Sequence, residues 1–204
     1  MTPRAVTSVV LVMFATSGCA ITSKITVTNS APKPIIIGGV EFPEAQGMQW
    51  KLTVKAVLDA PPEVVFADVI DPIPDGDRIP KKAIVTIDHS RSDAGPNQWG
   101  TGSTFRGEYN GKSGEFTVIH CQPPYLVAHR KLVKSKSRTS RGLNVFELHR
   151  SQDGGTMMTV HLFMSTHKKP WWPGLLKWAS GQSLKRDMGD LVHKHGGYYK
   201  LIDE

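Results

Sequence analysis

Eight histidines are the groups in this chain best suited to bind a metal ion or to move a proton. Metal binding is not favoured, because His193 and His195 stand two residues apart on an expected helix and so do not share a face. The sequence also lacks the His-Glu-x-x-His and Cys-x-x-Cys spacings that are typical of zinc sites. We therefore expect no metal and no other cofactor.

A wider set of side chains could act as acids or bases if they lined a cavity. The hairpin register described below puts Glu108 and Glu115 on an outer face. His120 and His161 remain as candidate proton shuttles, although a hydrogen-bonded core histidine is the commoner role. We assign no catalytic residue. The full set is Tyr109, Glu108, Glu115, His120, His129 and His161.

Two glycine-containing segments imitate nucleotide-binding loops but have the wrong spacing. Residues 107–113 have three residues between their glycines where a phosphate loop requires four, and they lie in a hairpin instead of leading into a helix. Gly100-Thr101-Gly102 continues to Phe105, where a dinucleotide fingerprint needs glycine. No Gly-x-Ser-x-Gly elbow occurs either. The sequence thus contains no recognisable nucleotide site and no hydrolase elbow.

Composition limits the class of protein. Of the 204 residues, 39% are hydrophobic and 21% are charged, which is typical of a globular protein and excludes collagen-like, coiled-coil and wholly disordered chains. No apolar run reaches the roughly 18 residues that a lasting transmembrane helix needs. Two cysteines cannot form a disulfide framework, so a packed core must stabilise the domain. The net charge of +7 favours acidic partners, such as phospholipid surfaces or nucleic acid.

The first 19 residues are typical of a secretory signal peptide. A short basic start precedes a mainly apolar stretch and then small residues. Cys19 follows Ser17 and Gly18, which resembles the bacterial lipobox, in which the cysteine is acylated and becomes the mature N-terminus. Thr16 departs from that pattern, because a leucine-like residue is usual there. We expect a lipid anchor on Cys19 at the cell envelope; the alternative is a secreted or periplasmic protein without lipid.

Residues 20–47 are expected to form a tether. The segment shows no sustained hydrophobic period and contains Pro32, Pro34 and Pro43. As a flexible coil it would have an end-to-end distance of roughly 30 Å, which suffices to hold a domain just above a membrane. The alternative is a leading arm that packs onto the domain, which a short strand at residues 35–37 would favour.

Residues 48–204 are long enough for one domain with a real core, because a chain of this length buries about 70% of its unfolded surface. Trp50, Leu52, Val54 and Ala56 alternate with polar residues and predict a half-buried strand. Residues 59–63 predict the start of a short helix, with prolines in its first turn. Further strands are predicted over residues 82–89, 125–133, 143–150 and 156–166.

Asn110-Gly111 is the preferred pair for a two-residue type I′ turn, and it sets the register of the hairpin around it. Phe105 then pairs with Phe116 on one face, and Arg106 pairs with Glu115 on the other. The aromatic face must point inward, because the opposite face carries charged side chains.

The last element is predicted to be a helix over residues 175–195 that ends at Gly196-Gly197. The order is therefore strand, short helix, some six strands and one long C-terminal helix. An antiparallel sheet with its helices gathered on one face is an α+β architecture.

This pattern resembles the helix-grip domains of the START-like, or SRPBCC, superfamily, which includes polyketide cyclases/dehydrases, coenzyme Q-binding proteins and lipid carriers. The resemblance covers residues 49–195 and implies a curved sheet of about seven strands that wraps round the last helix, with a ligand cavity between them. It says little about function, because the superfamily hosts binding, transfer and catalysis. It rests on residues 60–66, 102–107, 116–118 and 122–126 and on the terminal helix.

The resemblance implies that inward-facing residues line this cavity. We predict that they bind a hydrophobic small molecule, either a lipid or a polycyclic compound. The alternative for each residue is a plain role in the core. The predicted ligand-binding residues are Phe105, Phe116, Val118, His120, His161, Phe163, Trp178 and Met188.

Residues 130–141 contain six Lys or Arg and no acidic residue. They predict either a solvated hairpin tip or attraction to anionic lipid, at about 1 kcal/mol per basic side chain near the surface. Nucleic acid is disfavoured, because no aromatic residue interrupts the run to stack on bases. Two adjacent tryptophans beside lysines suit a membrane interface, a cavity lid or a helix staple. The residues assigned to a membrane surface are Lys134, Lys136, Arg138, Trp171 and Trp172.

The sequence thus predicts an exported, lipid-anchored domain that binds or carries a hydrophobic small molecule at the cell envelope. One alternative is a cyclase- or dehydrase-like enzyme that acts on a polyketide-type ligand in the same cavity, with His120 or His161 as proton shuttle. The other is an interaction protein that docks a partner through the basic hairpin.

Overall fold

The computed structural model describes residues 34–71, 80, 82–135, 139–166 and 173–202, except for the side chains of residues 173–180 and 183. The predicted signal peptide, Cys19 and residues 20–33 of the tether lie outside this part of the chain. Lys136, Arg138, Trp171 and Trp172 also lie outside it. None of the described helices is both long enough and apolar enough to cross a membrane.

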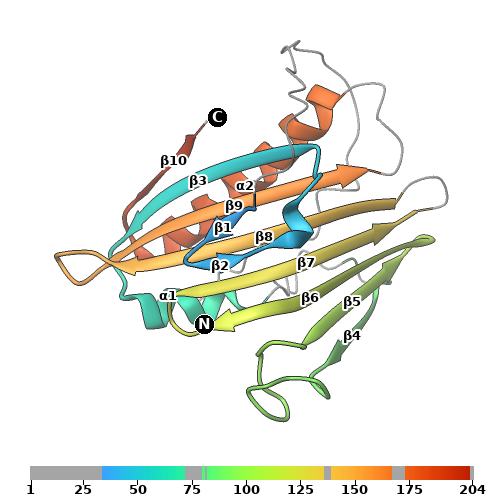
Figure 1. Ribbon diagram of the computed structural model, residues 1–204, viewed down its shortest axis with the longest axis horizontal. Coiled ribbons are helices and arrows are strands. Elements are labelled where there is room, and N and C mark those ends of the chain that lie inside the picture. Colours follow the sequence, from blue (N-terminus) through green and yellow to red (C-terminus); the bar gives the residue numbers. More distant parts are fainter. Residues whose placement is uncertain (1–33, 72–79, 81, 136–138, 167–172, 203–204) are drawn as a thin grey trace.

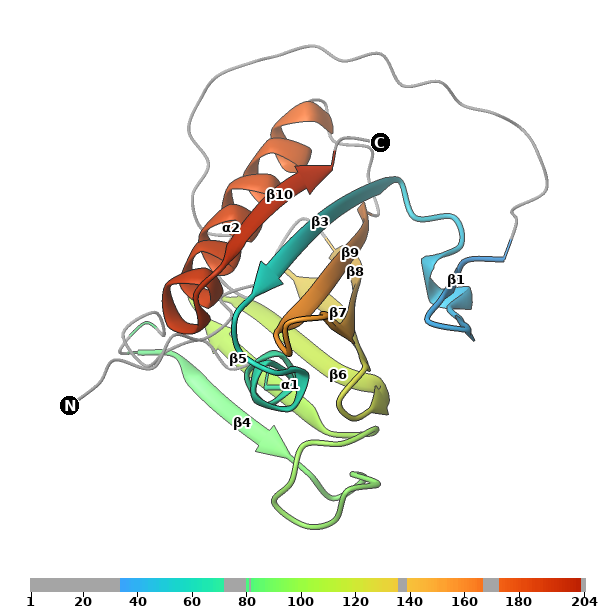
Figure 2. The same cartoon turned by 90° about the vertical axis from the view of Figure 1, so that its left-hand side faces the viewer.

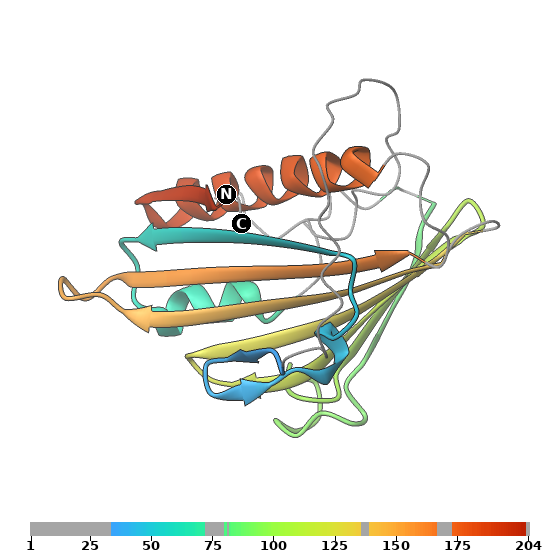
Figure 3. The same cartoon turned by 45° about the horizontal axis from the view of Figure 1, so that its top comes forward.

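Within the described residues, eight antiparallel strands form one curved sheet in the order β10-β3-β9-β8-β7-β6-β5-β4 (Figure 1). Both helices lie on its concave face, so the fold is α+β as predicted (Figures 2 and 3). The strand after the C-terminal helix, β10, was not expected and raises the number from seven to eight. The bounds are β3 (Trp50–Leu58), β4 (Ile84–Asp88), β5 (Thr104–Tyr109), β6 (Lys112–Gln122), β7 (Leu126–Lys134), β8 (Thr139–Arg150), β9 (Thr156–Thr166) and β10 (Tyr198–Ile202).

The hairpin of β5 and β6 has the predicted register. Asn110 and Gly111 adopt φ angles of 49° and 70°, as a type I′ turn requires. Phe105 and Phe116 are cross-strand partners, and their rings lie with centroids 6.3 Å apart and planes tilted by 60°. On the opposite face, Arg106 Nε donates to Glu115 Oε2 over 2.8 Å. The turn chemistry alone therefore determines which side chains of this hairpin point inward.

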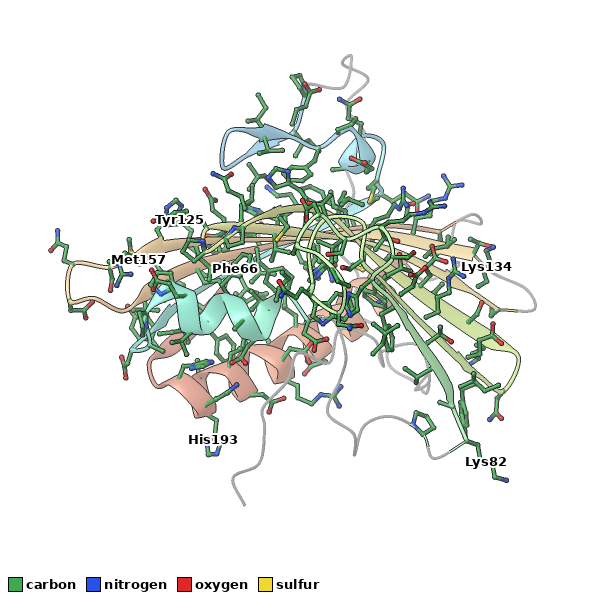
Figure 4. The ribbon with its side chains drawn as sticks, turned by 90° about the horizontal axis from the view of Figure 1, so that it is seen from below. Phe66, Lys82, Tyr125, Lys134, Met157 and His193 are labelled. Atoms are coloured by element: carbon green, nitrogen blue, oxygen red, sulfur yellow. The ribbon has the colours of Figure 1, made fainter. Side chains whose placement is uncertain are left out.

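The short helix α1 (Pro62–Val69) packs beneath β8 and begins with Pro62, whose missing N–H costs nothing in a first turn. Its buried residues include Val65 and Phe66, and Figure 4 shows Phe66 on the helix side of the sheet. The helix α2 (Pro173–His195) crosses above β3 and β10 and buries Leu184, Met188 and Leu191 against them. These two helices provide the apolar cover of the concave face.

The end of α2 is attached to α1 and to β3. Lys194 Nζ and His195 Nε2 each lie 2.5 Å from Oδ2 of Asp68 on α1. The chain then reverses through Gly197, whose φ is 97° and where a Cβ would collide with the carbonyl oxygen of Val57. This reversal brings β10 back alongside β3.

Residues 34–47 do not form a free tether. They form an arm of β1 (Ile36–Ile37), β2 (Val40–Glu41) and the 3₁₀ turn η1 (Pro43–Ala45), which packs on the convex face of the sheet (Figures 2 and 4). The alternative of a packed leading arm is therefore correct for this segment. The arm and sheet residues buried together are Ile37, Phe42, Ala45, Leu126, Ala128, Leu143, Val145 and Phe163.

We predict that Phe42→Ala lowers the free energy of unfolding by about 3 kcal/mol, because Phe42 is only 2% exposed beneath the arm. Ile36→Ala is the matched control, since Ile36 belongs to the same arm but is 61% exposed, and it should change stability by less than about 0.5 kcal/mol. Urea denaturation measures both. Equal, small effects would show that the arm does not stabilise the domain.

Candidate functional site

The concave face carries the first group of predicted ligand-binding residues. Cross-strand pairing places Phe105, Phe116, Lys131 and Gly142 in one row on this face, running from β5 to β8. Both phenylalanines are buried, at 2% and 1% exposure. The neighbouring row consists of Val118, His129, Asn144, Leu162 and Leu52.

Met188 of α2 packs into the same core cluster as Val118 and Leu162. The structure thus brings Phe105, Phe116, Val118 and Met188 to the same side of the sheet. Trp178 belongs to α2, but its side chain lies outside the described residues.

His120 lies on the convex face, contrary to the expectation that it points inward. The pairing of β6 with β7 shifts between Val118 and His120, so one extra residue reverses the side to which the chain points. The ring of His120 instead meets Phe42 of the arm edge to face, with centroids 6.3 Å apart. A simple count of alternating residues cannot detect such a bulge.

His161 and Phe163 also lie on the convex face, where Phe163 is buried with the arm and His161 stacks on it. Nδ1 of His161 lies 3.5 Å from Oγ1 of Thr53, on the adjacent strand. The inward residues of β9 include Val160 and Leu162. The expectation failed because β9 is apolar on both faces, so alternation does not identify the inner one. Neither His120 nor His161 can therefore serve as a proton shuttle on the concave face.

Four polar residues face the apolar interior between the sheet and α2, and we call them the polar cluster: His129 and Lys131 of β7, Asn144 of β8 and Asp187 of α2. His129, Asn144 and Asp187 are buried, and Lys131 is half-buried. His129 sits directly opposite Asn144, and Lys131 is two residues farther along the same face. Asp187 is fully buried and immediately precedes Met188 on the covered side of α2. The polar cluster is the candidate functional site.

The electrostatics of Lys131 are dominated by burial. Desolvation lowers its pKa to about 8, while the carboxylate of Asp187 acts in the opposite direction and favours the charged ammonium. Nζ lies 5.1 Å from the centre of the Phe116 ring, a distance at which the ring attracts a cation. Lys131 is thus held between an aromatic face and a buried carboxylate.

His129 is held in its neutral form. Burial lowers its pKa to about 4, and its Nε2 lies 3.1 Å from the carbonyl oxygen of Ile70 at the end of α1. Since a carbonyl oxygen only accepts hydrogen bonds, Nε2 must carry the proton. His129 therefore adds no charge to the polar cluster at neutral pH.

Asn144 is 3% exposed, and its side-chain Nδ2 has no hydrogen-bond partner within the described part of the chain. A buried donor without an acceptor costs about 1–3 kcal/mol, so native proteins seldom keep one without a reason. This amide group is available to an acceptor atom that enters the interior. No group of three or more His, Cys, Asp or Glu suited to a metal ion occurs among the described residues.

Sequence reasoning weighed His129 of this cluster as an acid or base, and it counted Lys131 only as one of the basic residues of 130–141 expected at a solvated or lipid-facing hairpin tip. Two signals could have found other members. Asp187 interrupts the apolar stripe of Leu184, Met188 and Leu191, and Asn144 interrupts the apolar run of β8. A polar residue at a position that periodicity assigns to the core is more informative than another apolar residue there.

Comparisons with known proteins inform the fold only. No protein-family model matches the chain, and no curated protein is significantly similar to it. A conserved protein from Geobacillus kaustophilus has a similar structure, with a TM-score of 0.52 and 11% identity over 74% of this chain and 99% of that one. A putative uncharacterized protein from Rhizobium leguminosarum gives a TM-score of 0.51 and 16% identity, over 71% and 95% of the two chains. Such likeness shows a shared fold and leaves function open.

We predict that Asp187→Leu and Lys131→Met each lower the free energy of unfolding by about 3 kcal/mol, because each leaves an uncompensated charge in the interior. The double variant should be within about 1 kcal/mol of the unsubstituted protein, since it removes both charges together. Urea denaturation at pH 7 measures the stability of the two single variants and of the double variant. Lys134→Met, at the exposed end of β7, is the control. Strictly additive losses would show that the two residues do not interact.

Proposed function

We propose that this protein binds a hydrophobic small molecule between the concave face of its sheet and α2. The observation that carries the proposal is the polar cluster, of which His129, Asn144 and Asp187 are buried among apolar residues of the helices and of the sheet. A mostly apolar interior with a few convergent polar groups is the usual composition of a small-molecule site. Phe105 and Phe116 are proposed to contact the apolar body of the ligand, together with Val118 and Met188.

Glycines on the same face support the proposal. Gly107 and Gly114 face each other across β5 and β6, in the row beside Phe105 and Phe116. A Cβ added at Gly107 would come no closer than 3.7 Å to another side chain, and one at Gly114 no closer than 3.8 Å. Glycine weakens a strand, and at these two positions no close contact with the described residues requires the absence of a side chain. We infer that these positions leave space for a ligand.

We further propose that the fold is the helix-grip fold and that the chain is a member of the START-like superfamily. The order of elements, the curved sheet and the C-terminal helix support this assignment. We prefer binding or transport to the alternative cyclase- or dehydrase-like activity, because the two histidines considered for proton transfer lie on the other face.

We predict that Gly114→Leu weakens binding of the neutral apolar dye N-phenyl-1-naphthylamine at least tenfold, because the new side chain would occupy the proposed site. Ser113→Leu is the matched control, since Ser113 is the neighbouring residue on the outer face of the same strand, and it should change affinity less than twofold. Dye fluorescence titration measures both, and native mass spectrometry of protein from its host tests for a copurifying ligand. A protein that neither binds the dye nor retains any ligand would overturn the proposal.

The cellular setting is proposed from the sequence alone: export, with Cys19 carrying a lipid that anchors the protein at the cell envelope. Lys134, Lys136 and Arg138 of the basic hairpin and the tryptophan pair are proposed to contact an anionic membrane surface. Of these five residues only Lys134 is described, as an exposed side chain at the end of β7. Figure 4 shows Lys134 at the end of the sheet remote from Met157 and Tyr125.

We predict that Cys19→Ala moves the protein from the membrane fraction to the soluble fraction of its host, because the acylated thiol is lost. Cys121→Ala is the control, since Cys121 is a partly buried thiol on β6 and should not affect fractionation. Incorporation of labelled palmitate should disappear with Cys19→Ala only. If Cys19→Ala remains in the membrane fraction, the lipid anchor is wrong.

A further inference from the structure

The charges of the polar cluster balance without a ligand. Lys131 supplies one positive charge and Asp187 one negative charge, and Asp187 acts on Lys131 to favour its ammonium form. His129 faces the same interior and is neutral, and Asn144 carries no charge. Asp68 contacts Lys194 and His195 at the C-terminal end of α2, where Lys194 supplies the counter-charge to its carboxylate. A charged ligand would therefore add an uncompensated charge to this interior.

The magnitude of that penalty decides between ligand classes. A carboxylate ligand would lie near Lys131 and also near the buried carboxylate of Asp187, and an amine would meet Lys131 itself. Burying an ion without a counter-charge costs several kcal/mol, more than an ordinary hydrogen bond returns. An uncharged ligand avoids this cost.

The hydrogen-bonding groups specify the polar atom of that ligand. Nδ2 of Asn144 is a donor that finds no acceptor within the described residues, and it is almost completely buried. The ammonium of Lys131 carries only donors, and its side chain starts two residues along the same face. A Cβ at Gly142, opposite Lys131, would lie 3.3 Å from the carbonyl oxygen of Phe163 and 3.5 Å and 3.8 Å from Cβ and Cδ of Lys131, so the glycine lets the Lys131 side chain lie across this position. An oxygen that accepts two hydrogen bonds matches these donors.

We propose that the ligand of this protein is an uncharged apolar molecule that presents a carbonyl or hydroxyl oxygen to Asn144 and Lys131. This inference rests on the proposed function and specifies the class of ligand at the same site. Phe105 and Phe116 lie beside Lys131 in the same cross-strand row, and their aromatic rings would contact the apolar part of the molecule. Asp187 keeps the ammonium charged and does not contact the ligand.

Four eleven-carbon probes that differ at one end test the inference: undecane, 2-undecanone, undecanoate and undecylammonium. Each competes with N-phenyl-1-naphthylamine for the full-length protein at pH 7.5. We expect 2-undecanone to displace the dye with an affinity at least tenfold higher than that of undecane or of either charged probe. This measurement on the unsubstituted protein depends on no variant that could fail to fold.

Asn144→Leu, which is similar in size, isolates the amide. This substitution should lower the affinity for 2-undecanone at least fivefold and leave the affinity for undecane unchanged. It should also make the protein more resistant to urea, because it removes a buried unpaired donor. A purely structural role of Asn144 would leave the ratio of the two affinities unchanged. Lys131→Met is the second variant, and it should shift preference toward undecylammonium, because Asp187 then lacks its counter-charge.

The outcomes separate this inference from the proposed function. If undecanoate binds best, the site accepts an anion and the inferred ligand class is wrong, although ligand binding stands. If all four probes bind equally, the polar cluster does not contact the ligand, and the inference also fails. If the dye itself does not bind, the proposed function fails first.

Discussion

Burial on both sides of the central strands is the constraint on which the rest of this structure depends. The helices cover the concave face of β7, β8 and β9, and the arm of residues 34–47 covers their convex face. These strands are therefore apolar on both sides, as in a three-layer domain. A polar residue that faces either layer carries a desolvation cost, which is why the few polar residues in the interior identify the candidate site.

The pair of Lys131 and Asp187 shows how that cost is contained. Burial alone would drive the ammonium toward its neutral form, and the lowered pKa of about 8 records this effect. The carboxylate on α2 opposes it, so the attachment of α2 to the sheet and the charge state of Lys131 depend on each other. Apolar residues of similar size at both positions would satisfy packing without any charge. The pair is therefore weak evidence for a stabilising role, which agrees with the proposed role in recognition.

The elements of this fold were predictable wherever local chemistry decides the conformation. Asn110-Gly111 determined the register of β5 and β6, and the two glycines after residue 195 marked the end of α2. Predictions failed where distant segments decide. The inward face of β9 depends on what covers its other side, and the side of His120 depends on a bulge, so neither follows from alternation. The polar cluster was largely missed for the same reason, since it joins the β7–β8 hairpin to α2, which is far from that hairpin in sequence.

The protonation states within the polar cluster favour binding over proton-transfer chemistry. An efficient general acid or base has a pKa near the working pH, and His129, with a pKa of about 4, is far below neutrality and already donates to Ile70. Lys131, with a pKa of about 8, is closer, but deprotonation would leave Asp187 as an unbalanced buried charge. A proton that leaves this lysine thus destabilises the interior in which we propose that the ligand binds. The same ammonium is well suited to remain charged and donate hydrogen bonds, which is the role of a binding group.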